Sequence, residues 1–363
     1  MKKIIAVLLA LVMVLSFAAC NNGNNPANES GDIEVNEENN GEQGENAGAS
    51  SDYKLGMGVV VNADSACDNN AQIDTTVAAV VLDKDGKIVS AKLDACQNKL
   101  KVEGGQIPDL TTVDLRTKME KGNDYNMKAY ASNGAPAGEW YEQANFFCNY
   151  IIGMTGEEVG TLELTVRAED GYTVAADADL YAGCSIQIGE FMEAVKKACD
   201  DEHTKAFSGE NWTLGLGATM SIDGSTTSAT AEGNGTAALY SSYAAVVYGG
   251  DDIILCALLD AAQPKIEFDT EGSMGNFLFN GTKKELKEDY HMVEFAGAPA
   301  GEWYQQAEAF EEYATGKTAS EVEATELTTR ASDGYTVVAD PDLYASCSIQ
   351  IGDFVSDIIK ATK

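Results

Sequence analysis

Histidine is almost missing from this chain of 363 residues, which contains only His203 and His291. The chain carries an internal repeat, described below, and Asn126 stands in the first copy where His291 stands in the second. A histidine-based catalytic triad or zinc site is therefore excluded as a feature of both copies. No Walker loop, Gly-x-Ser-x-Gly elbow or dinucleotide-binding glycine motif follows a strand, and no pair of carboxylates stands out. The sequence therefore does not indicate an enzyme.

Basic residues are also few, with 24 against 58 acidic ones and a net charge of −34. No run of lysine and arginine is present, so nucleic acid and anionic lipid headgroups are poor partners on electrostatic grounds. Apolar residues make up 44% of the chain. That proportion is enough to build hydrophobic cores and excludes a wholly disordered protein.

Cys-x-x-Cys pairs are missing too, which argues against metal ligation or an iron–sulfur cluster. Apart from Cys20 there are seven cysteines, and only Cys184 and Cys347 occupy matching positions in the two copies. An odd number leaves at least one unpaired or paired with another chain. We predict that most of them are buried apolar residues rather than halves of a repeated disulfide.

The N-terminus has the pattern of a secretory signal peptide over residues 1–20. Lys2 and Lys3 precede an apolar run, and Ala18-Ala19-Cys20 follows it. This end resembles the lipobox of bacterial lipoproteins, which implies acylation of Cys20 and a lipid anchor on the extracytoplasmic face of the cell membrane. A soluble secreted protein with an incidental cysteine is the alternative. Residues 21–52 are acidic and lack aromatic side chains, which predicts a disordered tether.

An internal duplication organises the rest of the chain. We expect one domain over 53–199, a short polar linker over 200–210 and a second domain over 211–363. Each copy opens with two closely spaced glycines, in Leu55–Gly58 and in Leu214–Gly217, and we assign no function to them. The matching segments are Asp177–Phe191 with Asp340–Phe354, Gly138–Ala144 with Gly301–Ala307, and Leu55–Gly58 with Leu214–Gly217.

Each copy is predicted to be an α+β domain, with a mainly antiparallel sheet packed by helices. Residues 77–82 and 88–93 read as a β-hairpin whose turn contains Asp83 and Asp85. A calcium loop is the less favoured explanation of these acids, since further ligands are missing. Trp140, Ala144 and Phe147 recur at helical spacing, so Trp140 either packs in the core or stacks on a flat ligand.

The hairpin over residues 80–93 and the segment Asp179-Leu-Tyr-Ala-Gly183-Cys-Ser185 together resemble the bacterial FMN-binding domain family. That family ends in Asp-x-x-Ser-Gly-Ala-Thr-x-Ser, where FMN is esterified to the threonine through its phosphate. The repeat is also similar to clostridial and spirochaetal lipoproteins called major membrane immunogens. The resemblance implies FMN at Ser185 and Ser348, with the following further site residues: Asp179, Asp342, Gly183, Trp140, Trp303, Tyr181 and Tyr344.

The attachment segment departs from the family pattern at several positions. Serine replaces the acceptor threonine, cysteine replaces alanine, and Ser346 replaces the glycine in the second copy. A phosphate near a helix N-terminus would meet free backbone donors. The competing interpretation is a packing element without cofactor, because Ile186 and Ile188 alternate with polar residues as in a half-buried strand.

The expected function is that of a lipid-anchored extracytoplasmic protein with two FMN-binding-like domains that relays electrons at the surface. The membrane would then be one partner of the protein, through the lipid anchor. A flavin transferase and a redox partner would be the others. The alternative is a flavin-free lipoprotein that binds a small ligand or a surface partner, or serves only as a surface antigen.

Overall fold

The computed structural model describes residues 52–131 and 136–363. The predicted signal peptide, the lipobox cysteine Cys20 and the tether up to residue 51 lie outside the described residues. Residues 49–363 form one compact unit. Within the described ranges, no helix is both long and apolar enough to cross a bilayer.

The two copies of the duplication, expected over 53–199 and 211–363, are called repeat 1 and repeat 2. The sheet of repeat 1 is antiparallel and has the strand order β3-β2-β1-β6. Its strands are β1 (Tyr53–Asn62), β2 (Asn70–Asp83), β3 (Ile88–Lys101) and β6 (Thr204–Phe207). The predicted hairpin is confirmed, because β2 pairs with β3 across a turn at which the Asp83 carboxylate accepts hydrogen bonds from two backbone N–H groups. Asp83 therefore stabilises the turn geometry.

Repeat 2 builds the same hairpin from shorter strands. Its central sheet has the order β10-β9-β7, and a second sheet has the order β12-β11-β8. Pro264 separates β10 from β11, at the position that Asn98 occupies within β3. Proline has no N–H to donate to the ladder, so the long strand breaks there. The bounds are β7 Thr213–Ser221, β8 Gly235–Ala238, β9 Tyr240–Tyr248, β10 Ile254–Ala262, β11 Lys265–Phe268 and β12 Met274–Leu278.

The helices follow in the same order in both repeats. Each repeat also has a small hairpin among its helices, β4–β5 between α4 and α5 or β13–β14 between α10 and α11. Repeat 1 has α1 Lys118–Lys121, η1 Gly122–Tyr125, α2 Met127–Tyr130, α3 Trp140–Tyr150, α4 Gly156–Gly160, β4 Leu164–Val166, β5 Thr173–Ala175, α5 Ala178–Gly183 and α6 Gly189–Cys199, with η2 Asp201–His203 after it. Repeat 2 has α7 Lys283–Leu286, η3 Lys287–Tyr290, α8 Met292–Ala296, α9 Trp303–Ala314, α10 Ala319–Glu323, β13 Leu327–Thr329, β14 Thr336–Val338, α11 Pro341–Ser346 and α12 Gly352–Ala361.

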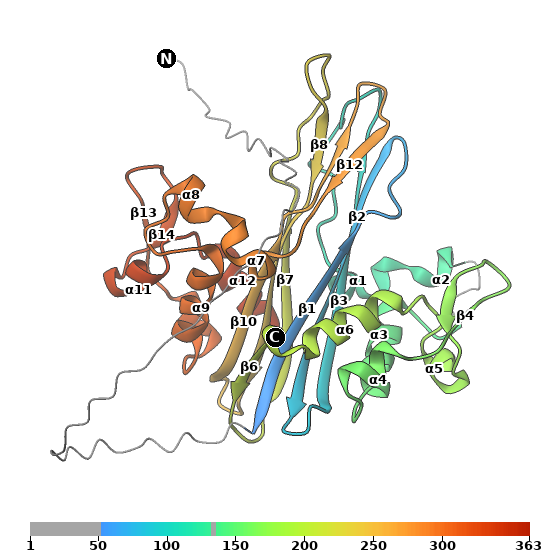
Figure 1. Ribbon diagram of the computed structural model, residues 1–363, viewed down its shortest axis with the longest axis horizontal. Coiled ribbons are helices and arrows are strands. Elements are labelled where there is room, and N and C mark those ends of the chain that lie inside the picture. The colour runs from blue at the N-terminus through green and yellow to red at the C-terminus, as the bar shows by residue number, and fades with distance from the viewer. Residues whose placement is uncertain (1–51, 132–135) are drawn as a thin grey trace, which may run out of the picture. The chain divides into compact units, whose positions relative to one another are not determined.

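The two sheets pack against each other, and each carries its helices on the opposite face. A shared core joins Leu55 and Val59 of β1 to Leu214 of β7 and Tyr243 of β9. A separate core lies between each sheet and its own helices. Figure 1 shows both sheets in the middle, with the helices of repeat 1 and repeat 2 on opposite sides. The α+β class is confirmed, and the repeats share one core.

The glycine pairs, left without a function above, are the places where a helix lies directly on a strand. A Cβ atom at Gly56 would stand 1.9 Å from the Ala198 carbonyl oxygen of α6, and one at Gly215 would stand 1.7 Å from that of Ala361 in α12. Only a residue without a side chain permits this approach. The pairs are therefore packing devices.

Residues 200–210, expected to be a polar linker, differ from that expectation. They contain η2 and strand β6, which pairs with the outer edge of β1 and buries Phe207. The connection between the repeats is thus part of the sheet of repeat 1.

Ion pairs between the repeats are reciprocal. Lys197 of α6 contacts Glu285 of repeat 2 at 2.5 Å, and the matching Lys360 of α12 contacts Glu120 of repeat 1 at 2.8 Å. Each lysine also donates to a carbonyl oxygen of its own repeat, that of Val59 or Ala218. This is the contact pattern of an isologous, two-fold interface.

Candidate functional site

The segment that resembles the FMN-attachment motif connects two helices, α5 and α6. Residues 184–188 are irregular, so the interpretation of this segment as a half-buried strand is wrong. Asp177 caps α5 by accepting from the backbone N–H of Leu180, and Asp340 does the same for α11. A helix C-terminus thus precedes the predicted acceptor serines, where a strand end had been expected.

Both acceptor serines are fully buried and their hydroxyls are engaged. The Ser185 N–H and hydroxyl group donate to Gln143 Oε1 at 2.8 and 3.3 Å. Ser348 makes the same bonds to Gln306 at 2.8 and 3.1 Å. The serines are 1% exposed. An ester at either hydroxyl would require these bonds to open.

An arginine holds the same segment from the other side. Arg167 donates to the Ser185 carbonyl oxygen at 2.5 Å, and Arg330 donates to that of Ser348 at 2.7 Å. Asp170 and then Tyr181 beside Arg167 keep the pKa of its guanidinium above its usual value. We call the serine, glutamine and arginine of each repeat the clamp. Sequence reasoning missed its glutamines and arginines, although both types recur in the repeat.

The other predicted site residues are spread around the clamp. Asp179 and Asp342 are exposed in the first turns of α5 and α11. A Cβ atom at Gly183 would stand 2.3 Å from the Phe146 ring, so this glycine is required by packing. In repeat 2 the larger Ser346 of α11 replaces Gly183, and the smaller Ala309 of α9 replaces Phe146. Tyr181 and Tyr344 interact with the arginines.

The tryptophans are core residues. Trp140 and Trp303 are 2% and 3% exposed, and each makes an edge-to-face contact with the first phenylalanine of the last helix, Phe191 or Phe354. Trp140 nevertheless also lines a cavity. Both roles considered for it are therefore compatible with its position.

That cavity, called here the repeat 1 cavity, has a volume of about 880 Å³. It opens beside Ile186 and Gln187, which belong to the repeated segment Asp177–Phe191, called here the featured segment. Its wall combines aromatic rings with charged groups, namely Tyr125, Tyr130, Trp140, Tyr172, Phe191, Lys118, Arg167, Asp74 and Glu190. Small-molecule sites combine aromatic side chains with placed polar groups, and in this cavity polar and apolar residues contribute about equally.

Lys118 is the cation that the aromatic wall orients. Its ammonium group lies 5.2 Å from the ring centre of Tyr125 and 5.3 Å from that of Trp140. Thr117 caps the short helix that carries it, and the buried Asp94 accepts from the N–H of Met119. Across the cavity, burial raises the pKa of Asp74 against the opposing effects of Gln72 and Lys118. The cavity can thus bind a flat ring with anionic or hydrogen-bonding groups.

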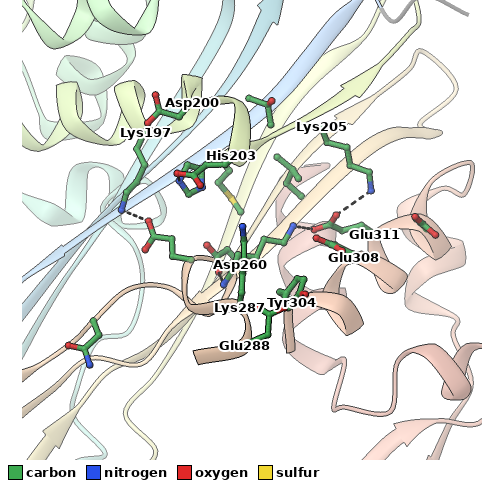
Figure 2. Close-up of a pocket in the computed structure, with 18 residues that line it drawn as sticks. Lys197, Asp200, His203, Lys205, Asp260, Lys287, Glu288, Tyr304, Glu308 and Glu311 are labelled. Atoms are coloured by element: carbon green, nitrogen blue, oxygen red, sulfur yellow. Dashed lines mark hydrogen bonds and ion pairs between the residues drawn. The ribbon is translucent and has the colours of Figure 1, made fainter. Parts of the chain in front are cut away.

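A second cavity, called the junction cavity, lies between the repeats and has a volume of about 1030 Å³. Figure 2 shows Glu311 bonded to Lys205 and to a second lysine. That lysine is Lys284, at 2.5 Å, and Lys205 lies at 3.2 Å. The Leu259 N–H also donates to the Glu311 carboxylate. These central charges already bind one another, so they stabilise the junction and do not form a ligand site.

The described residues contain no group of three or more side chains arranged to hold a metal ion. Seven cysteines are free thiols, and five of them are buried, which confirms the prediction of buried apolar cysteines. Burial raises the pKa of Cys184 to about 12. A buried thiol with such a pKa is a poor nucleophile.

No family model matches the chain, and no solved structure matches it either. A curated protein named chlorophenol reductase, from Desulfitobacterium hafniense, is 29% identical over 148 residues. The match spans 37% of this chain and 44% of that protein. The similarity therefore covers less than half of the relative's length.

Proposed function

We propose that this protein is an extracytoplasmic flavin-binding electron carrier, and that the flavin lies in the repeat 1 cavity. The observation that carries the proposal is the cavity of about 880 Å³ with aromatic rings and charged groups of both signs in its wall, directly beside the segment that resembles the FMN motif. Cavities of this size accommodate cofactors. Bound FMN would supply the redox chemistry, while the protein supplies binding and orientation.

The residues present fit such a group. Lys118 offers positive charge to its anionic groups, whereas Arg167 is already paired with Asp170. The rings of Tyr125 and Tyr172 line the same wall, each with a cation over one face. Tyr130, at the same cavity, is 83% exposed and offers a further ring. The acidic chain would otherwise repel a phosphate, so the positive charge of Lys118 matters.

The clamp favours reversible binding over an ester. Ser185 and Ser348 are buried and hydrogen-bonded to glutamines, so their hydroxyls do not face an incoming phosphate. Reversible binding in the cavity leaves these bonds intact. A mass measurement distinguishes the two modes, because esterification at Ser185 or Ser348 by a transferase would add the mass of FMN to the chain and reversible binding would not.

The curated relative bears the name of a reductase of chlorophenols. A reductase transfers electrons, which supports a redox role for the matching part of this chain. The same name supports the second candidate, a flavin-free protein that captures a small aromatic molecule. The aromatic wall suits a phenol ring as well as a flavin.

FMN titration of the purified chain tests the proposal. We expect quenching of FMN fluorescence, with the ligand removed on dialysis. Lys118→Met should weaken binding about tenfold, because it removes a charged hydrogen-bond donor. The exposed Lys84→Met is the matched control and should bind normally. Binding of a chlorophenol but not of FMN would support the second candidate, and FMN mass retained after denaturation would show an ester.

We also propose that Cys20 anchors the protein to the membrane. The wild type should partition into the detergent phase of a membrane extract, and Cys20→Ser should move to the aqueous phase. Equal partitioning of the two proteins would contradict the anchor.

A further inference from the structure

The strand register identifies one position that differs sharply between the repeats. Val77 pairs with Asp94 in repeat 1, and Tyr243 pairs with Asp260 in repeat 2. Counting back three residues along each strand places Asp74 and Tyr240 at the same position of the fold. Asp74 lines the repeat 1 cavity, so its counterpart stands where the second copy would have its own cavity.

Tyr240 fills that position with a ring that packs on a lysine. The ammonium of Lys283, the counterpart of Lys118, lies 5.0 Å from the Tyr240 ring centre, 4.8 Å from that of Tyr290 and 5.2 Å from that of Trp303. Three aromatic rings therefore enclose the lysine, where Lys118 has two. Lys283 is only 6% exposed, whereas Lys118 is half-buried.

From this geometry we infer that the duplicated protein has one ligand site, in repeat 1, and that Tyr240 closes the corresponding site in repeat 2. The inference rests on the proposed function for the identity of the ligand, a flavin-sized planar aromatic anion. The closing itself follows from the packing, because a ligand would need the ring faces and the cation that Tyr240, Tyr290 and Trp303 already use among themselves.

The clamp is intact in repeat 2, so loss of the fold does not explain the closure. Gln306 and Arg330 hold Ser348 as Gln143 and Arg167 hold Ser185. The position of Tyr240 is therefore the determinant of whether a repeat can bind. Repeat 2 then acts as the structural partner of repeat 1 through their shared core.

Stoichiometry of FMN binding tests the inference. We expect one FMN per chain for the wild type, none for Asp74→Tyr, and two for Tyr240→Asp. Tyr240→Phe retains the ring and should stay at one. Two FMN per chain in the wild type, or an unchanged site in Asp74→Tyr, would overturn the inference while leaving flavin binding intact. Circular dichroism of each variant shows whether it is folded, and Tyr240→Ala replaces Tyr240→Asp if the latter unfolds.

Amine acylation followed by peptide mass mapping gives a readout that does not depend on flavin. Rates are compared for the neutral amine, obtained from their pH dependence, because burial lowers the pKa of Lys283 to about 7 and increases its neutral fraction. On that scale we expect Lys118 to react at least ten times faster than Lys283 in the wild type. Tyr240→Asp should raise the rate at Lys283 about tenfold and leave Lys118 unchanged. If the wild type binds no FMN, the proposed function fails, and closure is then judged by this measurement alone. Equal rates at Lys118 and Lys283 in the wild type would overturn the closure.

Discussion

At several matched positions repeat 2 has a charged side chain where repeat 1 has a neutral one. Buried Cys148 of α3 corresponds to buried Glu311 of α9, and half-buried Met119 of α1 corresponds to half-buried Lys284 of α7. Ala194 of α6 likewise corresponds to Asp357 of α12, which is fully buried. The clamp around the featured segment is nevertheless the same in both copies.

Features found in both repeats are required by the fold, whereas features found in one repeat were acquired by that copy. The clamp and the glycine contacts with the last helix occur in both repeats, so they belong to the shared architecture. The cavity described above lies in repeat 1, and the buried carboxylates Glu311 and Asp357 lie in repeat 2. Function should therefore be sought where the copies diverge, at Asp74 and Tyr240.

The largest effect is expected from Gly215→Ala. The new methyl group would stand 1.7 Å from the Ala361 carbonyl oxygen, so α12 must move away from β7. We expect a loss of about 3 to 5 kcal/mol of unfolding free energy. Gly189→Ala is the control, since nothing lies within 4 Å of its added Cβ. Urea denaturation that gives equal stabilities for the two variants would contradict a packing role for the glycine pairs.

A smaller loss, about 2 to 3 kcal/mol, is expected for Glu311→Gln. The substitution leaves Lys284, whose side chain is 19% exposed, without its opposite charge at the buried Glu311. The double variant Glu311→Cys with Lys284→Met installs the residues of repeat 1 and should recover most of the stability. A double variant as unstable as Glu311→Gln would show that the neutral pair of repeat 1 does not suit the junction.

Local patterns explain why much of the fold could be predicted. The β2–β3 hairpin and helix α3 follow from turn residues and apolar spacing within a few positions of sequence. The glycine pairs were read without function because their partners in α6 and α12 are distant in the chain. Strand β6 was missed for the same reason, as its partner β1 precedes it by a whole domain.

The site was predictable only in part. The featured segment does lie beside the cavity, through Ile186 and Gln187. The sequence alone does not show that Gln143 engages the Ser185 hydroxyl, because Gln143 comes from another helix. Nor does it show that Tyr240 closes on Lys283, because strand and helix meet only in the tertiary structure.

Asp357→Asn tests the buried charge of repeat 2 through pH. Burial raises the pKa of Asp357 from 3.8 to about 7, although Ser242 donates to it. The folded state therefore holds a proton that the unfolded state releases, and this group lowers stability as pH rises from about 4 to about 7. We expect the variant to be more stable than the wild type by about 4 kcal/mol at pH 8 and by little at pH 4.

Urea denaturation at both pH values measures that difference, and other titrating groups cancel between variant and wild type. Ala194→Asp places a carboxylate at the same position of repeat 1 and should reduce stability at pH 8. A constant difference between Asp357→Asn and wild type at both pH values would show that Asp357 does not titrate in this range.

The smallest effect is expected at the reciprocal ion pairs, and it tests whether the repeats are related by two-fold symmetry in energy as well as in geometry. The side chains of Lys197 and Glu285 are 29% and 21% exposed, and those of Lys360 and Glu120 are 35% and 34% exposed. Pairs so accessible to water contribute about 0.5 kcal/mol, and salt weakens them further. Glu285→Gln and Glu120→Gln should therefore lower unfolding free energy by similar small amounts, and both losses should shrink in 1 M salt.

Because Glu285 also caps α7 and Glu120 caps α1, glutamine is chosen to keep the capping hydrogen bond. Clearly unequal losses would mean that the junction cavity, which Glu285 lines, stabilises one side of the interface more than the other.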